Sequence, residues 1–197
     1  MNQTGISSKL QIGIKHENSR VIANNNCGSM GYDLPAAIGS AVASKKEVIC
    51  VTGDGSIMMN LQELQTIKHY NLPVKVVIFS NDGYNAFRQT CKNFFNGFNV
   101  GCDAESGVSF PSFEKVADTF GYGYKCCHSN GELDECLDWL FSQEGQVILE
   151  VEQRLDDPIT PKVMSRINDK GEFVTPSIED MYPFIDEEEY KSLMIGK

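Results

Sequence analysis

The stretch that decides the fold spans residues 48–81 and reads VICVTGDGSIMMNLQELQTIKHYNLPVKVVIFSN. It begins with a short β-branched run, residues 48–52, of the kind that lies buried in a parallel sheet. A glycine turn at 53–56 follows, and then apolar residues at helical spacing, namely Ile57, Leu61, Leu64 and Ile67. Residues 74–79 read as a second buried strand. Because strand crossovers are right-handed, the two strands are predicted to be parallel in a βαβ unit.

A polar residue follows each of these strands: Asp54 after the first and Asn81 after the second. Parallel strands end at one edge of a sheet, where open α/β sheets bind ligands. A carboxylate, an amide oxygen and a backbone carbonyl suit Mg²⁺. Gly55 and Ser56 open the helix, whose N–H groups favour an anion. The pattern predicts a site for a Mg²⁺-bridged diphosphate. The alternative is an N-capped turn with an Asx-turn at Asn81.

The remainder of the chain continues the alternation of strand and helix. Strands are predicted at residues 20–23, 122–128 and 146–152. A glycine-rich turn and a helix are predicted within 27–44, and further helices at 112–120 and 131–142. The last helix is expected to point four residues inward: Leu133, Leu137, Leu140 and Phe141. This alternation predicts an α/β fold, a doubly wound, mostly parallel sheet with helices on both faces.

Composition narrows the class of protein. A chain of 197 residues can bury one core, with an extension. The 17 basic and 27 acidic residues give a net charge of −10, which disfavours nucleic acid and anionic membranes as partners. Seven cysteines without a C-x-x-C motif or secretory signal indicate reduced thiols in a cytoplasmic protein. The adjacent Cys126, Cys127 and His128 lack zinc-ligand spacing. No apolar run approaches the length of a membrane span.

Two separated motifs carry a family resemblance. The turn GDGS at 53–56, followed by Asn81, resembles the signature of thiamine diphosphate (TPP) enzymes. Upstream, residues 28–39 read GSMGYDLPAAIG, which is similar to the block GSMGYGLPAAIG of acetolactate synthase-like enzymes. Residues 71–76, NLPVKV, also resemble that family. The likeness runs from about residue 28 to 152 and implies a C-terminal TPP-binding domain with TPP and Mg²⁺ as cofactors.

The resemblance assigns roles to particular residues. It implies that Mg²⁺ is held by Asp54, Asn81 and the backbone carbonyl of Gly83. It also implies that the cofactor is bound by a wider set: Met30, Gly53, Asp54, Gly55, Ser56, Asn81, Gly83 and Tyr84. Met30 would be the bulky residue that enforces the V-shaped cofactor and so is the catalytic candidate. Its alternative role is ordinary core filling.

The resemblance also implies missing parts. Family members carry upstream domains, and their pyrimidine-binding domain supplies a glutamate that activates the cofactor. A strand that leads to a T-G step like Thr4-Gly5 is not found here. Residues 1–155 are therefore predicted to be a diphosphate-binding (PP) domain without its first strand, and 156–197 a C-terminal extension. The chain is expected to be inactive alone and to need a pyrimidine-binding domain or subunit in a homo- or hetero-oligomer.

The implied activity is that of a lyase or transferase: decarboxylation of a small 2-oxo acid such as pyruvate, followed by carboligation. Relatives carry a tryptophan on the helix after Asn81 that selects the acceptor, whereas this chain has Thr90 there and its only tryptophan is Trp139. Two alternatives stay open, a β-type subunit of a two-chain 2-oxo acid decarboxylase and a non-catalytic assembly module.

Three further features of the sequence lead to structural predictions. Arg88 either pairs with a substrate carboxylate or is a solvated surface arginine. A long loop at 92–111 carries Phe94, Phe95 and Phe98, which are predicted to meet a partner domain. In the proline-interrupted tail, the acidic run at 186–189 is typical of a solvated helix start.

Overall fold

The structure is a computed structural model of the 197-residue chain, and it describes residues 20–24, 27–154, 160–168 and 170–194. The chain divides into two compact units, residues 1–157 and 158–197. None of the helices within the described residues combines the length and apolar character needed to cross a membrane. The first unit contains the strands and turns on which the sequence prediction rests.

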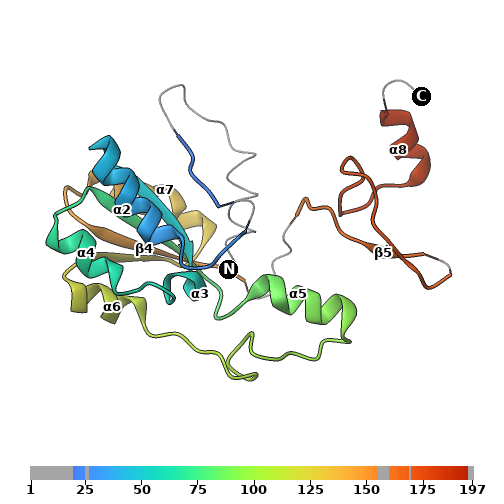
Figure 1. Ribbon diagram of the computed structural model, residues 1–197, viewed down its shortest axis with the longest axis horizontal. Helices are drawn as coiled ribbons and strands as arrows, with labels where there is room; N and C mark the ends of the chain where they lie inside the picture. Colours follow the sequence, from blue (N-terminus) through green and yellow to red (C-terminus); the bar gives the residue numbers. More distant parts are fainter. Residues whose placement is uncertain (1–19, 25–26, 155–159, 169, 195–197) are drawn as a thin grey trace. The chain divides into compact units, whose positions relative to one another are not determined.

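A four-stranded parallel sheet forms the centre of the first unit (Figure 1). Its strands lie in the order β1-β2-β4-β3, with bounds β1 (Val48–Gly53), β2 (Val74–Ser80), β3 (Gly123–Cys127) and β4 (Val147–Glu152). The predicted crossover is present, since β1 pairs in parallel with β2 from Val48 opposite Val74 to Gly53 opposite Phe79. The two inner strands, β2 and β4, consist largely of buried apolar residues, as expected for a sheet covered on both faces.

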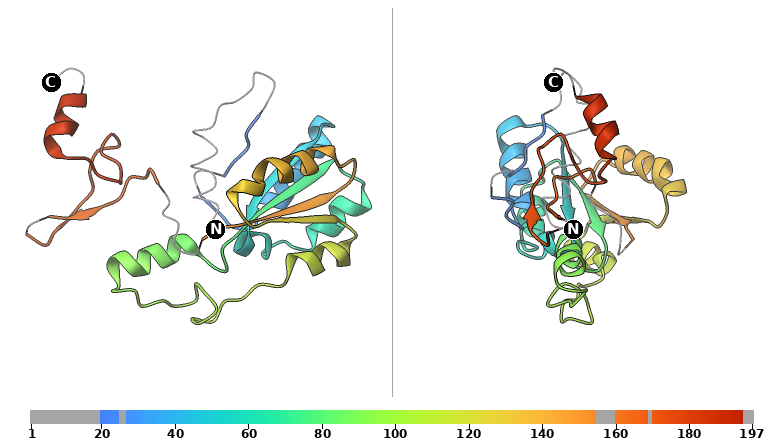
Figure 2. Two further views of the ribbon diagram at one scale, coloured as in Figure 1. Left: turned by 180° about the vertical axis from the view of Figure 1, so that it is seen from behind. Right: turned by 90° about the vertical axis from the view of Figure 1, so that its right-hand side faces the viewer.

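Helices cover both faces of the sheet. On one face, α2 (Asp33–Ser44), α4 (Glu63–His69) and α6 (Phe113–Phe120) bury a core around Leu34, Leu64, Ile78 and Ile148. On the other face, α7 (Leu133–Ser142) follows the short 3₁₀ turn η1 (Asn130–Glu132). It packs Cys136 and Leu140 against odd-numbered strand residues such as Val77. Figure 2 shows α2 and α7 on opposite sides of the strands. The predicted doubly wound α/β fold is confirmed.

Local signals set the ends of α6. The Ser112 hydroxyl caps its first turn by accepting a hydrogen bond from the Lys115 N–H at 3.4 Å. Gly121 ends it with a left-handed backbone, φ +70°, as expected of a C-terminal glycine. Phe113, Val116 and Ala117 are buried, and the helix predicted at 112–120 is confirmed.

The crossover helix of the decisive stretch is divided, unlike the single helix predicted. Helix α3 (Asp54–Ile57) ends after one turn, and residues 58–62 form tight turns before α4 begins. Asn60 lies at the break, where its side-chain amide donates to the Gly31 carbonyl oxygen at 2.6 Å. Ile57, Leu64 and Ile67 nevertheless remain fully buried.

Two other predictions are wrong. Residues 20–23 are not a strand: Val21 and Ile22 are exposed and have no ladder partner among the described residues. A lone extended segment leaves its backbone groups unpaired, so apolar composition alone does not make a strand. In α7, Leu133 and Phe141 are exposed rather than inward. The helix is turned so that Cys136 and Leu140 face the sheet.

Helix α5 (Asn85–Phe94) lies beyond the carboxyl end of β2 and extends away from the sheet (Figure 1). It and the following loop expose Phe94, Phe95 and Phe98. Their contact with a partner domain stays a prediction. Thr4 and Gly5 lie outside the described residues.

The second unit is small. It contains the antiparallel pair β5 (Arg166–Ile167) and β6 (Phe173–Val174) and the helix α8 (Glu187–Leu193). The Asp186 carboxylate caps α8 by accepting hydrogen bonds from the N–H groups of Glu188 and Glu189. The acidic run therefore starts a helix, as predicted.

Candidate functional site

The predicted pair, Asp54 and Asn81, meets at the carboxyl edge of the sheet. Asp54 Oδ2 accepts a hydrogen bond from the Asn81 backbone N–H at 2.8 Å and a longer one from Gly83 N–H at 3.4 Å. Its other oxygen accepts from Gly55 N–H at 2.8 Å. The carboxylate is fully buried. It therefore links the end of β1 directly to the end of β2.

The Asn81 side chain is also buried, with 3 % of the residue exposed. Its Oδ1 accepts a hydrogen bond from Arg88 Nη2 at 3.2 Å. Its Nδ2 has no hydrogen-bond partner among the described residues. A buried donor left unpaired costs about 1–3 kcal/mol. This amide is therefore a position where a bound group would find an unmet polar atom.

Arg88 is half-buried and so is not a solvated surface arginine, and its pairing with a substrate carboxylate stays a prediction. Its guanidinium donates to main-chain oxygens of Asn81 at 3.0 Å, Asp82 at 3.3 Å and Cys102 at 3.4 Å, besides Asn81 Oδ1. Several oxygen atoms therefore converge on one positive group at the end of β2. An oxygen-rich position that holds a cation has the chemistry a Mg²⁺ site requires. Among these contacts the guanidinium uses Asn81 Oδ1, one of the predicted metal ligands.

Gly83 permits the close approach of a second loop. Its φ is +154°, and a Cβ built there would lie 2.1 Å from the Cys102 carbonyl oxygen. A side chain at this position would therefore push that loop away from the end of β2. The residue predicted to offer a backbone carbonyl stands at a place where only glycine fits.

Tyr84 stands over the start of α3. A Cβ built on Gly55 would lie 2.2 Å from Tyr84 Cε1, so the tyrosine ring packs directly on the glycine backbone. The same ring contacts Phe110 edge-on, with centroids 6.1 Å apart. Two of the predicted cofactor-binding residues, Gly55 and Tyr84, are thus neighbours. The glycine is required because the ring approaches so closely.

A buried hydrogen-bond network joins the two sequence motifs through a residue for which sequence reasoning had no role. Asp33 Oδ2 accepts hydrogen bonds from the hydroxyls of Ser56 at 2.6 Å and Thr52 at 2.5 Å. Ser56 Oγ in turn accepts from Gly31 N–H at 3.0 Å. Met30, half-buried, lies beside Gly31 in the same loop. Asp33 occupies a position where the family block has glycine. This difference in sequence could have marked Asp33 as a residue of the site.

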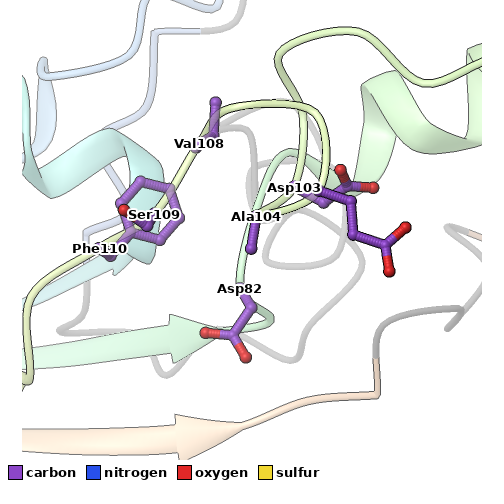
Figure 3. A pocket seen from close by; sticks show the side chains of 7 residues that line it. Asp82, Asp103, Ala104, Val108, Ser109 and Phe110 are labelled. Atoms are coloured by element: carbon purple, nitrogen blue, oxygen red, sulfur yellow. The ribbon is translucent and has the colours of Figure 1, made fainter.

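A cavity of about 350 Å³ lies next to this site, below the loop that covers the end of β2 (Figure 3). Three of its lining side chains are acidic: Asp82, Asp103 and Glu105. The Ser106 hydroxyl donates to Asp103 and holds the pKa of that carboxyl below its usual range. An acidic lining repels the carboxylate of a 2-oxo acid and favours cationic groups.

The helix expected to face the substrate supplies little recognition of its own. On α5, the Thr90 hydroxyl donates to the Ala86 carbonyl oxygen at 3.0 Å, within the helix. Trp139 lies on α7, against the core on the other face of the sheet. The structure thus brings no tryptophan to this site.

Comparison with known proteins gives one matching family model. The model described as "Thiamine pyrophosphate enzyme, C-terminal TPP binding domain" matches residues 4–151. The acetolactate synthase large subunit of Porphyra purpurea is 34 % identical over 151 residues, covering 76 % of this chain and 25 % of the relative. The isozyme 2 large subunit of Escherichia coli K12 is 34 % identical over 131 residues, covering 66 % of this chain and 23 % of that subunit.

A solved structure resembles the fold. It is the thiamine diphosphate-dependent 4-hydroxybenzoylformate decarboxylase of Rhodococcus jostii RHA1, with a TM-score of 0.58 and 26 % sequence identity. The match covers 66 % of this chain and 24 % of the decarboxylase. This chain therefore spans about a quarter of the length of the relatives it matches.

Proposed function

We propose that this chain, which belongs to the thiamine pyrophosphate enzyme family as a C-terminal TPP-binding domain, supplies the diphosphate- and Mg²⁺-binding half of an acetolactate synthase-like active site. We assign residues 1–155 to this module and 156–197 to an extension. The observation that carries the proposal is the contact between the buried Asp54 carboxylate and the backbone N–H of Asn81. It brings the two predicted metal ligands to one edge of the sheet.

The residues present fit the implied cofactors. The ligand set at the ends of β1 and β2 is made of oxygen atoms, which Mg²⁺ prefers. The unmet atom of the buried Asn81 amide is Nδ2, a hydrogen-bond donor, which suits an oxygen atom of the diphosphate and not a metal ion. Asp54, Asn81 and the Gly83 carbonyl would hold Mg²⁺. Backbone groups of Gly53, Gly55 and Ser56 would face the diphosphate, and Met30 and Tyr84 would contact the cofactor. When bound, TPP supplies the decarboxylation and carboligation chemistry.

The hydrogen bonds around Asp33 support different roles for the side chain and the backbone of Ser56. The Ser56 hydroxyl is engaged with Asp33 and Gly31, so its side chain positions the two loops, and its backbone N–H is left as the group for an anion. Tyr84 covers Gly55 and excludes water from the start of α3. In this proposal the chain's own residues bind and orient the cofactor, and a pyrimidine-binding partner supplies the activating glutamate.

Calorimetric titration of the full chain with TPP, with and without MgCl₂, tests the metal assignment. We expect binding that depends on Mg²⁺ and falls at least about a hundredfold in Asp54→Asn, which keeps the size of the buried side chain. The matched control is Asp82→Asn, an exposed carboxylate just after the neighbouring strand β2. Equal losses in both variants, or no loss in Asp54→Asn, would reject Asp54 as a ligand.

Product analysis tests the activity. The chain alone should show no turnover of pyruvate, and acetolactate formed by the pure chain would contradict that. With a pyrimidine-binding partner added, acetolactate supports the proposed reaction. Acetaldehyde supports the second candidate, a subunit of a 2-oxo acid decarboxylase, which is favoured by the decarboxylase fold neighbour and by the absence of tryptophan at position 90. Intact TPP binding without any turnover would indicate an assembly module.

The proposal also includes a reducing compartment and an oligomeric assembly. All seven cysteines are free thiols, which supports a reducing compartment such as the cytoplasm. The exposed Phe94, Phe95 and Phe98 support an oligomer in which α5 and its loop are covered.

A further inference from the structure

The carboxyl ends of β3 and β4 carry a second set of side chains able to bind a metal. Successive residues of a strand point to opposite faces, so Cys126 and His128 share a face and Cys127 points away from them. Cys127 is buried in the α7 side of the core, and its thiol donates to the Ser129 carbonyl oxygen at 3.3 Å. The three residues are adjacent in the sequence. In the fold, however, Cys127 lies on the face opposite to Cys126 and His128.

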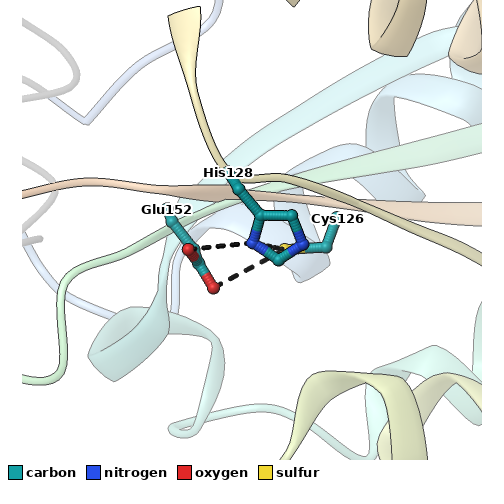
Figure 4. Close-up of side chains that lie close together, drawn as sticks. All are labelled: Cys126, His128 and Glu152. Atoms are coloured by element: carbon teal, nitrogen blue, oxygen red, sulfur yellow. Dashed lines mark hydrogen bonds and ion pairs between the residues drawn. The ribbon is translucent and has the colours of Figure 1, made fainter. Parts of the chain in front are cut away.

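The register of the sheet adds a third group to Cys126 and His128. Cys127, the last residue of β3, pairs with Val151, so His128 directly follows β3 at the level where β4 ends in Glu152. His128 Nδ1 and a Glu152 carboxylate oxygen are 3.0 Å apart. Cys126 Sγ lies 3.7 Å from His128 Nδ1 and 3.8 Å from Glu152 Oε1. The thiol, imidazole and carboxylate face one another (Figure 4).

These separations suit a tetrahedral metal ion. With Zn–S of ~2.3 Å and Zn–N or Zn–O of ~2.0–2.1 Å, ligand atoms in a tetrahedron lie roughly 3.4–3.6 Å apart. The nearest distances between the groups run from 3.0 to 3.8 Å, with Glu152 Oε2 nearest the imidazole and Oε1 nearest the thiol. One ligand atom from each residue falls within 4.8 Å of the other two. Small rotations of side chains would equalise these distances without moving the strands.

A catalytic Cys-His-Glu relay is a weaker interpretation of the same residues. In such a relay the thiol and the carboxylate bond to different nitrogens of the imidazole, so that a proton passes through the ring. Here both groups face Nδ1. Three groups directed at one point are suited to a shared cation, and not to proton relay.

We propose that Cys126 Sγ, His128 Nδ1 and the Glu152 carboxylate bind one Zn²⁺ ion, with the fourth position open to water or a small ligand. A thiolate with an imidazole selects a borderline-soft ion over Mg²⁺. On binding, the Cys126 proton is released to solvent and a sulfur–zinc bond forms. Side chains of His128 and Glu152 are 61 % and 53 % exposed, so the ion can enter from solvent.

Neighbouring residues hold this arrangement in place. Glu132 Oε2 accepts a hydrogen bond from the His128 backbone N–H at 3.0 Å, and Glu132 Oε1 accepts from the Ser129 hydroxyl at 3.0 Å. Glu150 is engaged by the Tyr124 hydroxyl at 2.6 Å, which leaves Glu152 as the carboxylate that faces the thiol. The extra carboxylates also create a negative field that attracts a cation.

The proposed zinc site is one strand away from the proposed Mg²⁺ site and independent of it. Glu152 pairs with Ser80, the residue before Asn81, and Gln153 N–H donates to the Ser80 carbonyl oxygen at 2.7 Å. The donor atoms differ, because one site offers oxygen and the other sulfur and nitrogen. Loss of TPP binding and loss of zinc binding can therefore be measured separately.

The experiment titrates the metal-stripped full chain with ZnCl₂ by equilibrium dialysis and with CoCl₂ by absorption spectroscopy, without TPP. We expect one zinc ion per chain and a thiolate-to-cobalt charge-transfer band. Cys126→Ser should abolish the band, and His128→Gln and Glu152→Gln should each weaken zinc binding about tenfold or more. Circular dichroism confirms that these exposed-edge variants stay folded.

Matched variants make the result decisive. Cys27→Ser, His69→Gln and Glu144→Gln change exposed residues of the same types elsewhere in the first unit and should leave zinc binding unchanged. Asp54→Asn should also keep it, which separates this site from the one at β1 and β2. The proposal is overturned if the chain binds no zinc. It is also overturned if the cobalt band survives in Cys126→Ser, or if the control variants lose as much affinity as the ligand variants.

Discussion

Two neighbouring pairs of strand ends on one sheet edge differ in almost every physical property. At β1 and β2, Asp54 and Asn81 are buried and are surrounded by backbone hydrogen bonds. At β3 and β4, Cys126, His128 and Glu152 are partly or largely exposed and contact one another through side chains. The first pair suits a hard ion held within a closed site, and the second suits a softer ion reached from solvent.

The difference shows that the turn residues after a strand decide whether the polar groups at its end are covered or exposed. Gly55 and Gly83 let Tyr84 and the Cys102 carbonyl approach the first pair, so that it is covered. At the second pair, β3 leads through His128 and Ser129 into η1, and His128 and Glu152 are exposed within the part of the chain that the structure describes. The same topology therefore places an enclosed set of oxygen atoms beside an exposed set of sulfur, nitrogen and oxygen atoms. Four variants test this difference.

The largest expected effect is on the stability of the buried pair. Asp54→Ala removes the acceptor of three backbone N–H groups, at Gly55, Asn81 and Gly83. At about 1–3 kcal/mol for a buried unpaired donor, we expect the free energy of unfolding in urea to fall by about 3 kcal/mol or more. Asp138→Ala, an exposed position on α7, should stay within about 0.5 kcal/mol of the parent. Equal costs would show that the first pair is not enclosed.

The next effect tests the close approach at the end of β2. Gly83→Ala places a Cβ 2.1 Å from the Cys102 carbonyl oxygen at a φ of +154°, so we expect a loss of about 2 kcal/mol in unfolding free energy. Gly145→Ala, next to β4, meets no atom within 4 Å and serves as the control. If both alanines are tolerated alike in urea denaturation, the covering loop does not hold its place.

The third effect concerns the cation at Asn81. The Arg88 guanidinium lies 3.2 Å from Asn81 Oδ1, where it competes with a metal ion for that oxygen. Two unit charges about 4 Å apart repel by about 1 kcal/mol in water, so a guanidinium and a divalent ion repel by about 2 kcal/mol. Arg88→Gln should therefore bind Mn²⁺, used as a paramagnetic substitute for Mg²⁺, roughly thirtyfold more tightly. Lys92→Gln, an exposed cation on the same helix, should leave the affinity unchanged. Weaker binding in Arg88→Gln would mean that the arginine supports the metal site.

The smallest effect is a pH dependence in the loop over the first pair. The Ser106 hydroxyl is the main cause of the lowered pKa of Asp103. A carboxyl with a lowered folded-state pKa stabilises the fold above its unfolded-state pKa, and this contribution is lost as the pH falls through the folded-state pKa. Ser106→Ala should raise the Asp103 pKa in an NMR titration and remove that acid-sensitive contribution. Ser109→Ala, an exposed serine of the same loop, should leave the titration as it was.

Prediction from sequence worked where the signal was contained in a short segment. The strands at 48–52 and 74–79 and the helix at 112–120 each depend on neighbours in the chain, and the structure confirms them. Prediction from sequence failed where the structure of a segment depends on its packing against distant parts of the chain. The orientation of α7 depends on which of its faces meets the sheet, and residues 20–23 needed a partner strand to become one.

The chain alone predicts the parallel βαβ unit and the presence of Asp54 and Asn81 at adjacent strand ends, because turn glycines and apolar periodicity are local properties. The folded arrangement was needed to find that Asp33 joins the two motifs, that Arg88 faces Asn81, and that Glu152 meets Cys126 and His128. Those contacts depend on strand register and helix placement. Both are set by long-range packing, which sequence spacing does not encode.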